Sequence, residues 1–341
     1  KGGKTYFIKE FLAPKYPIPD SPGSEKTKEK KRKACDEFEK HHRDLNSAIG
    51  KCCAGTGGNL IYAIDFFRNG ASYYKVTEKI DISTLPCESI ARLPLEKILL
   101  IAKSAVHSIR ILHGLKIVHG DLKPDNLPIK EAMRGYVVKL IDFDDSYFEC
   151  NPPSDRENLV GTPEYYSPEQ AAYIMDEDEE IEGDTLTCKS DIFTLGIIFS
   201  EYFSGEKPIL SGGHKNTWTC INDGKSISFK KPLPTKIENL IRSMLSLNPN
   251  DRPSISEVFN VLKDVKPDEG VSGGETTAGV TAKKPVLRFG PGFKPSGSKG
   301  VEPPKTGTEV PKRPTTSPAS PEEKPKSTGG LRGSGLKLAD K

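Results

Sequence analysis

The pattern of apolar and polar positions predicts strands near the start of the chain. Residues 4–11 alternate between polar and apolar side chains, which is typical of a strand. Two further apolar runs, 59–67 and 71–78, flank Asn69-Gly70. Because Asn-Gly between apolar runs is a strong hairpin signal, we predict that these two runs pair as antiparallel strands.

Later residues follow the spacing of helices. A charged helix is predicted over residues 25–50, and residues 95–112 carry a wide apolar face of a buried helix that Gly114 is expected to end. Amphipathic helices are predicted over 233–247 and 254–265. The predicted strands and the charged helix therefore come first along the chain, and the other predicted helices follow them.

A different composition begins at residue 266. Residues 266–341 are rich in Pro, Gly, Ser, Thr and Lys, without periodicity, which predicts a disordered tail or linker. This segment holds 14 Lys and Arg against 8 Asp and Glu, a net charge of +6, so the preceding part carries −3 of the total of +3. The basic total therefore does not indicate a nucleic-acid-binding domain, although the tail could recruit partners.

Cysteine usage and hydropathy favour a cytoplasmic protein. The seven cysteines form no paired C-x-x-C motif, which argues against a disulfide framework or a zinc ribbon. The chain has no apolar run of about 18 residues, and no apolar signal region opens it. We therefore expect no membrane span.

Candidate chemistry concentrates in the polar loop 119–126, between the apolar runs 115–118 and 137–141. The loop carries Asp121, Lys123 and Asn126, and the second run is followed by Asp142. Phosphoryl transfer needs such a set: a carboxylate for the attacking hydroxyl, a cation for the moving group, and an amide with a second carboxylate for magnesium. The alternative is a turn in which Asp121 and Asn126 only satisfy backbone groups.

Three motifs together resemble protein kinases. Residues 119–126, His-Gly-Asp-Leu-Lys-Pro-Asp-Asn, resemble the catalytic loop, and 142–144, Asp-Phe-Asp, resemble Asp-Phe-Gly. Residues 161–169 resemble the segment that ends in Ala-Pro-Glu, with Ser for Ala. The resemblance implies an α+β, two-lobed fold, with residues 1–80 as an incomplete first lobe and residues 81–265 as a mainly helical second lobe. It also implies that the domain binds ATP and Mg²⁺ and phosphorylates protein Ser or Thr. It makes Asp121 and Lys123 catalytic and gives the metal to Asn126 and Asp142.

The resemblance also assigns nucleotide-binding positions in the first lobe. It implies that Lys9 binds the phosphates and pairs with a glutamate of the charged helix, Glu39, with Glu37 as the alternative. It places Thr77 at the gatekeeper position and Glu78 to Ile80 at the hinge that meets adenine. An ordinary edge strand is the alternative reading of this second stretch.

The resemblance also assigns structural roles to residues outside the catalytic loop. Thr162 is expected to hydrogen-bond Asp121 and Lys123, and Glu169 to pair with Arg252. Asp191 is expected to support the catalytic loop, with Gly196 in the same motif.

The chain departs from the kinase pattern at several places. No Gly-rich loop precedes Lys9, and neither Gly2-Gly3 nor residues 55–58 supply one, so either the chain is a fragment, as its non-Met start favours, or this lobe is degenerate. Gly120 replaces an arginine that receives activating phosphate. Asp144 replaces a glycine that reaches positive φ easily. We expect a solvated or capping role for it, with an approach to the metal as the alternative.

Two function classes follow from these observations. The first is a serine/threonine kinase whose activity does not depend on phosphorylation of the segment around Ser154. The second is a pseudokinase that binds nucleotide or acts as a scaffold. The acidic residues 176–180 suggest either a solvated loop or a preference for basic substrates.

Overall fold

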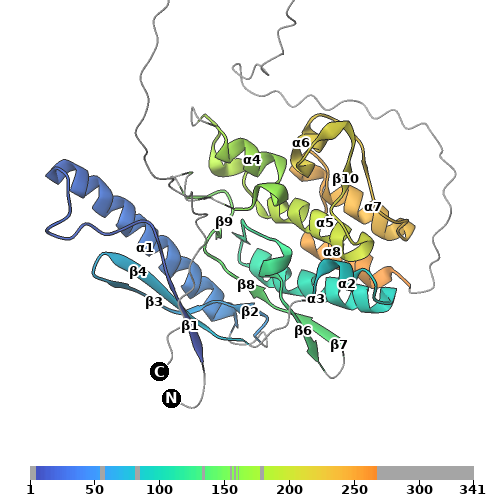
Figure 1. Ribbon diagram of the computed structural model, residues 1–341, viewed down its shortest axis with the longest axis horizontal. Coiled ribbons are helices and arrows are strands. Elements are labelled where there is room, and N and C mark those ends of the chain that lie inside the picture. Colours follow the sequence, from blue (N-terminus) through green and yellow to red (C-terminus); the bar gives the residue numbers. More distant parts are fainter. Residues whose placement is uncertain are drawn as a thin grey trace, which may run out of the picture. The chain divides into compact units, whose positions relative to one another are not determined.

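The first part of the chain is an antiparallel sheet with one long helix beside it. The computed structural model describes residues 5–53, 58–80, 85–132, 135–153, 156, 159, 161–176 and 180–266. Strands β1 (Tyr6–Glu10), β3 (Ala63–Asn69) and β4 (Ser72–Glu78) pair in the order β1-β4-β3, and helix α1 (Glu25–Cys53) runs alongside (Figure 1). The predicted Asn-Gly hairpin is confirmed, since Asn69 pairs with Ser72 across the turn.

Aromatic packing joins α1 to this sheet. Phe11, Cys35, Phe66 and Tyr73 form one buried cluster, and Phe38 of α1 packs against it. Phe66 and Tyr73 lie parallel, with ring centroids 5.8 Å apart. The charged helix therefore contacts the sheet through a narrow apolar stripe, while most of its charges stay in water.

The second part is mainly helical, and the main core lies there. Helices α3 (Leu95–Gly114) and α5 (Cys188–Ser204) are its most buried elements. The remaining helices are α2 (Cys87–Ile90), α4 (Pro168–Ile174), α6 (Thr217–Asn222), α7 (Thr235–Met244) and α8 (Ile255–Asp264). Single 3₁₀ turns are η1 (Pro124–Asn126), η3 (Pro163–Tyr165), η4 (Gly183–Thr185), η5 (Ser211–Gly213) and η6 (Pro249–Asp251).

Eight short strands form four two-stranded sheets among the described residues. The pairs are β2 (Leu60–Ile61) with β8 (Leu140–Ile141), β5 (Ile117–Val118) with β9 (Tyr147–Phe148), β6 (Ile129–Ala132) with β7 (Gly135–Val138), and β10 (Ile209–Leu210) with β11 (Ile227–Ser228). The pairing of β2 with β8 is parallel and joins the two parts of the fold. The pairs β5–β9 and β6–β7 flank the polar loop 119–126.

Capping residues mark the start of α8 and the end of α5. Ser254 and Glu257 form a capping box at the start of α8, and Gly205 ends α5 in the left-handed conformation. The predicted helix 95–112 is two residues short, because α3 includes Gly114 and its cap is Leu115. The left-handed residue there is Lys116, with φ of 58°.

Some predicted features lie outside the described residues. The tail is described only to residue 266, and the glycine cluster only at Gly58. Of the acidic run, Asp176 and Glu180 are described. No helix among the described residues combines the length and apolar character that a membrane span needs.

Candidate active site

Asp191 of α5 holds the polar loop 119–126 through hydrogen bonds to its backbone. The backbone N–H of His119 donates to Asp191 Oδ2 at 2.8 Å, and that of Gly120 donates to Oδ1 at 3.2 Å. The ring of His113 contacts the same carboxylate at 2.8 Å. The predicted support of this loop by Asp191 is therefore confirmed.

Asp121 lies at the centre of a hydrogen-bonded group. Lys123 Nζ lies 2.6 Å from Asp121 Oδ2 and 3.0 Å from the hydroxyl of Thr162, which donates to Asp121 Oδ1 at 2.8 Å. The amide nitrogen of Asn126 donates to the backbone oxygen of Asp121 at 2.7 Å. The predicted contacts of Thr162 are thus confirmed, and the carboxylate of Asp121 is held in one orientation.

Gly120 has no room for a side chain. Its φ is +82°, and a Cβ atom there would lie 2.3 Å from the backbone oxygen of Asp145. Its own carbonyl accepts from Gln170 Nε2 of α4 at 2.7 Å. The loop is therefore tied to α4 directly, and an arginine at position 120 is incompatible with this backbone.

We predict that Gly120→Ala lowers the free energy of unfolding by about 2 kcal/mol or more. The left-handed backbone costs a residue with Cβ about 1–2 kcal/mol, and the overlap with Asp145 adds to it. Urea unfolding measures the change. Gly114→Ala is the matched control: a Cβ there meets nothing within 4 Å, and alanine suits a helix better. Equal stability of Gly120→Ala and wild type would contradict the prediction.

A buried ion pair joins α4 to the segment before α8. Arg252 contacts both oxygens of Glu169, at 2.6 and 2.8 Å, and its side chain has no solvent exposure. Its guanidinium also donates to three backbone carbonyls, those of Lys189, Ser246 and Leu247. The predicted Glu169–Arg252 pair is confirmed.

The predicted pairing of Lys9 with Glu39 is wrong. Glu39 accepts from Arg43 one turn later on α1, at 2.8 and 3.0 Å, and the alternative, Glu37, lies 3.9 Å from Lys33. Lys9 Nζ instead lies 2.5 Å from Asp144 Oδ2 and 3.4 Å from Asp142 Oδ2. The i,i+4 neighbour on the helix competes successfully for Glu39.

Lys75 of β4 is a residue that the sequence interpretation missed. Its Nζ lies 2.7 Å from Asp142 Oδ1 and also pairs with Asp144. Alternation along β4 places residues 75 and 77 on one face. Since Thr77 was predicted to face the nucleotide, the same alternation could have identified Lys75.

The backbone at residues 142–144 differs from the expectation. Asp142 takes positive φ, 60°, and Asp144 is not among the described residues that do. Asp144 therefore needs none of the conformational freedom of glycine. Its carboxylate is free to serve as an ion-pair partner of the two lysines.

Charges in the site shift each other's protonation. Burial raises the pKa of Asp142, but Lys75 and Lys9 more than offset this and hold that pKa well below its usual range. Burial lowers the pKa of Lys9, and Asp144 and Asp142 raise it to a net increase. Burial, with Asp121, Asp144 and Asp142 nearby, raises the pKa of Asp145 to about 7. The carboxylate groups are therefore crowded, and the two lysines stabilise the charged form of Asp142.

The predicted adenine-binding residues lie at the end of β4. Thr77 pairs with Phe7 of β1, and Glu78 pairs with Tyr6. Ile80 lies two residues beyond the end of the strand and is partly buried. The strand that carries Lys9 thus lies beside these residues, and their contact with adenine stays a prediction.

The side-chain oxygens of Asp142 and Asn126 are suitable ligands for Mg²⁺. Asp142 supplies carboxylate oxygens with a partly exposed side chain, and Asn126 uses its amide nitrogen for the loop, which leaves its amide oxygen for a metal. Among the described residues no three His, Cys, Asp or Glu side chains could together hold a metal. Mg²⁺ commonly takes one or two protein ligands and completes its coordination shell with waters and substrate phosphates. Asp142 and Asn126 therefore fit a Mg²⁺ site.

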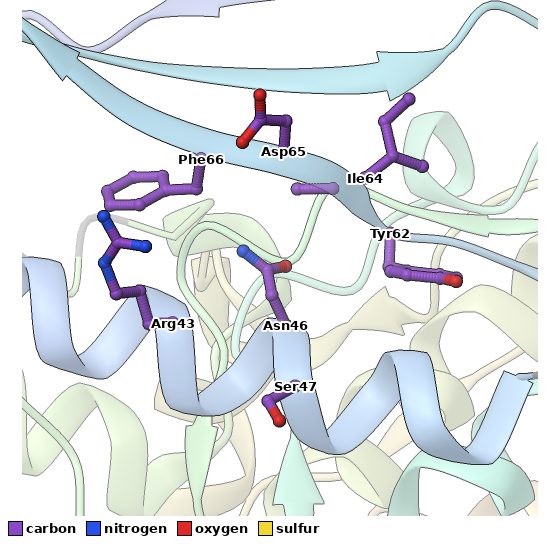
Figure 2. A pocket seen from close by; sticks show the side chains of 8 residues that line it. Arg43, Asn46, Ser47, Tyr62, Ile64, Asp65 and Phe66 are labelled. Carbon is purple, nitrogen blue, oxygen red and sulfur yellow. The ribbon is translucent and has the colours of Figure 1, made fainter.

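A separate hollow of about 340 Å³ lies between α1 and β3. Figure 2 shows Arg43 and Asn46 rising from α1 toward the strand that carries Asp65 and Phe66. Tyr62 and Ser47 also line it. Neither the residues of the polar loop nor Asp142 line this hollow, so it is distinct from the candidate active site.

Comparison with known proteins agrees with this geometry. The chain is 32% identical over 157 residues to serine/threonine-protein kinase PLK2 of Mus musculus, covering 46% of this chain and 21% of that protein. It is 28% identical over 212 residues to mitogen-activated protein kinase kinase 2 of Arabidopsis thaliana, covering 59% and 55%. For serine/threonine-protein kinase pkn3 of Myxococcus xanthus the identity is 29% over 179 residues, covering 48% and 30%.

The chain thus spans about a fifth of the first relative and about half of the second. A family model, protein kinase domain, matches residues 25–262, which include the polar loop, Asp142 and the Glu169–Arg252 pair. Lys9 and β1 precede the matched residues. The two-lobed fold, the loop geometry and this match agree that the chain belongs to the protein kinase domain family.

Proposed function

We propose that residues 1–265 form a serine/threonine protein kinase domain that transfers the γ-phosphoryl group of ATP to protein hydroxyls. The observation that carries the proposal is the carboxylate of Asp121, held by Lys123 and Thr162. Lys123 stands two residues after the loop aspartate, as in the serine/threonine branch of the family. The polar loop and Asp142 hold the residue types needed to orient the hydroxyl, to neutralise the moving group and to bind Mg²⁺.

Asp121 would orient the substrate hydroxyl and accept its proton. Lys123, which already contacts Asp121, would neutralise charge that develops on the transferred group. Lys9 would bind the ATP phosphates, and Thr77, Glu78 and Ile80 would contact adenine. Asn126 and Asp142 would hold Mg²⁺, which when bound neutralises phosphate charge.

A pseudokinase is the second candidate function. It is favoured by the lysine–aspartate contacts, because both Lys9 and Lys75 occupy the carboxylate of Asp142 that would bind metal. It is disfavoured by the presence of all five residues expected to act: Lys9, Asp121, Lys123, Asn126 and Asp142. Nucleotide binding without transfer would identify this second function.

The test measures two quantities on one protein preparation. Nucleotide binding is followed with ATP and Mg²⁺, and phosphorylated amino acids are identified in a basic acceptor protein after incubation. Phosphoserine or phosphothreonine supports the proposal. Binding with no phosphorylated product supports the pseudokinase, and phosphotyrosine alone would contradict the assignment to the serine/threonine branch.

We predict that phosphatase treatment leaves the transfer rate unchanged within about twofold. Gly120 stands where an arginine would receive an activating phosphate, and the loop contacts α4 directly through Gln170. The measurement compares initial rates before and after treatment, with removal of phosphate verified by mass. A rate that falls with loss of phosphate from residues 145–168 would contradict the prediction.

The location and partners of the protein are also proposed. All seven cysteines lie in described residues and form no disulfide there, which supports a reducing compartment such as the cytoplasm. Protein substrates would enter at the Asp121 side of the loop, and the segment from residue 266 would recruit further partners.

A further inference from the structure

Four charged side chains meet beside the polar loop, and we call them the lysine–aspartate cluster: Lys9, Lys75, Asp142 and Asp144. Each lysine contacts both aspartates. The separations range from the very short Lys75–Asp144 pair to 3.4 Å between Lys9 and Asp142. The cluster is therefore a closed ring of two positive and two negative charges.

The ring has a buried side and an open side. The side chains of Lys75 and Asp144 are 11% and 15% exposed, whereas those of Asp142 and Lys9 are 38% and 47% exposed. A ligand from solvent thus reaches Asp142 and Lys9 first. Lys75 and Asp144 form the part that stays in place behind them.

The sheet forces the two lysines together. Lys9 and Lys75 are direct partners in the antiparallel pairing of β1 with β4, and like charges in that position repel. Helix α1 supplies no carboxylate to offset the repulsion, since Glu39 is bound to Arg43. The helix instead places His42 near the lysines. Burial lowers the pKa of His42 to about 3, together with the nearby His41, Lys75 and Lys9, so this side chain is neutral.

We propose that Asp144 is a positioning residue that holds Lys9 and Lys75 when Mg²⁺ binds Asp142. In the structure both lysines contact Asp142, so a metal ion there competes with them for its oxygens. Asp144 keeps a carboxylate within reach of both lysines when the metal weakens their contacts with Asp142. For Lys9, the resemblance to kinases had implied that Glu39 plays this role. The inference rests on the proposed function, because it assumes Mg²⁺–nucleotide at Asp142.

The test measures the Mg²⁺ concentration that gives half-maximal binding of a fluorescent ATP analogue. Asp144→Asn is expected to raise it about tenfold or more, because both lysines then depend on Asp142 alone. Lys75→Met is expected to lower it or leave it unchanged, because one competing cation is gone. Glu39→Gln and the exposed Lys97→Met are the controls, and both are expected to match wild type within about twofold.

The double variant Lys75→Met/Asp144→Asn separates positioning from direct metal binding. If Asp144 acts through the lysines, removal of Lys75 returns most of the Mg²⁺ affinity that Asp144→Asn loses. If Asp144 is itself a metal ligand, the double variant stays as weak as Asp144→Asn, and that result overturns the inference. General damage to the fold would weaken binding in Lys75→Met as well, which would also overturn it.

The result is distinguishable from failure of the proposed function. A wild-type protein that binds Mg²⁺–nucleotide but transfers no phosphate would refute the kinase and still allow this comparison. Transfer in the wild type with an unshifted Mg²⁺ requirement in Asp144→Asn would refute the inference alone. Absence of Mg²⁺-dependent nucleotide binding in the wild type would refute both.

Discussion

Asp121→Asn is expected to lower the rate of phosphoryl transfer by about 10²–10⁴-fold, the usual contribution of a positioned proton acceptor. The amide keeps the size of the side chain but cannot take the proton of the substrate hydroxyl. It also removes the charge that Lys123 contacts at 2.6 Å. Initial rates of phosphate incorporation into an acceptor protein measure the effect.

The control for Asp121→Asn is the same substitution at an exposed position. Asp251 in η6 is exposed, and Asp251→Asn is expected to keep the wild-type rate within about twofold. Nucleotide binding by Asp121→Asn should persist, since Lys9 and Asp142 are unchanged. A transfer rate within about tenfold of wild type would remove Asp121 from the mechanism.

Glu169→Gln is expected to reduce the free energy of unfolding by about 3–5 kcal/mol, the usual effect of breaking a buried ion pair from one side. Arg252 would keep its charge in a site without solvent exposure, where neutral groups such as backbone carbonyls and the new amide would replace the carboxylate. Denaturant unfolding, followed by fluorescence, measures the loss. The effect should exceed that of any exposed ion pair in the domain.

Glu238→Gln is the matched control for the Glu169 variant. Glu238 pairs with Arg242 one turn later on α7, and both side chains are more than one third exposed. Its loss is expected to cost about 0.5 kcal/mol or less. Similar losses at Glu169 and Glu238 would show that the buried pair does not stabilise the fold as argued.

Contacts implied by the resemblance to protein kinases could be predicted from the sequence, although they join distant residues. The contacts of Thr162 with Asp121, of Glu169 with Arg252, and of Asp191 with the loop follow from motifs that have one geometry. The strands and helices with clear periodicity were also predicted. Helix α5 was not predicted as a helix, because it is buried on nearly every side and so lacks an amphipathic pattern.

The partner of Lys9 could not be predicted in this way. Helix α1 carries many charges, and the choice among its glutamates depends on side chains that turn toward neighbours on the same helix. Glu39 pairs with Arg43 on the same helix, whereas Lys9 pairs with Asp144 and Asp142, which are distant in the sequence. Such a choice depends on how the sheet meets the residues after β8, which periodicity does not encode.

Transfer of labelled phosphate from ATP–Mg²⁺ to a basic acceptor protein, with Asp142→Asn measured in parallel, tests the central claim most directly. We expect incorporation by the wild type and loss of at least about a hundredfold in the variant, because the amide replaces the carboxylate proposed to hold Mg²⁺. Equal incorporation by the two proteins, or none by a wild type that binds ATP, would contradict the account.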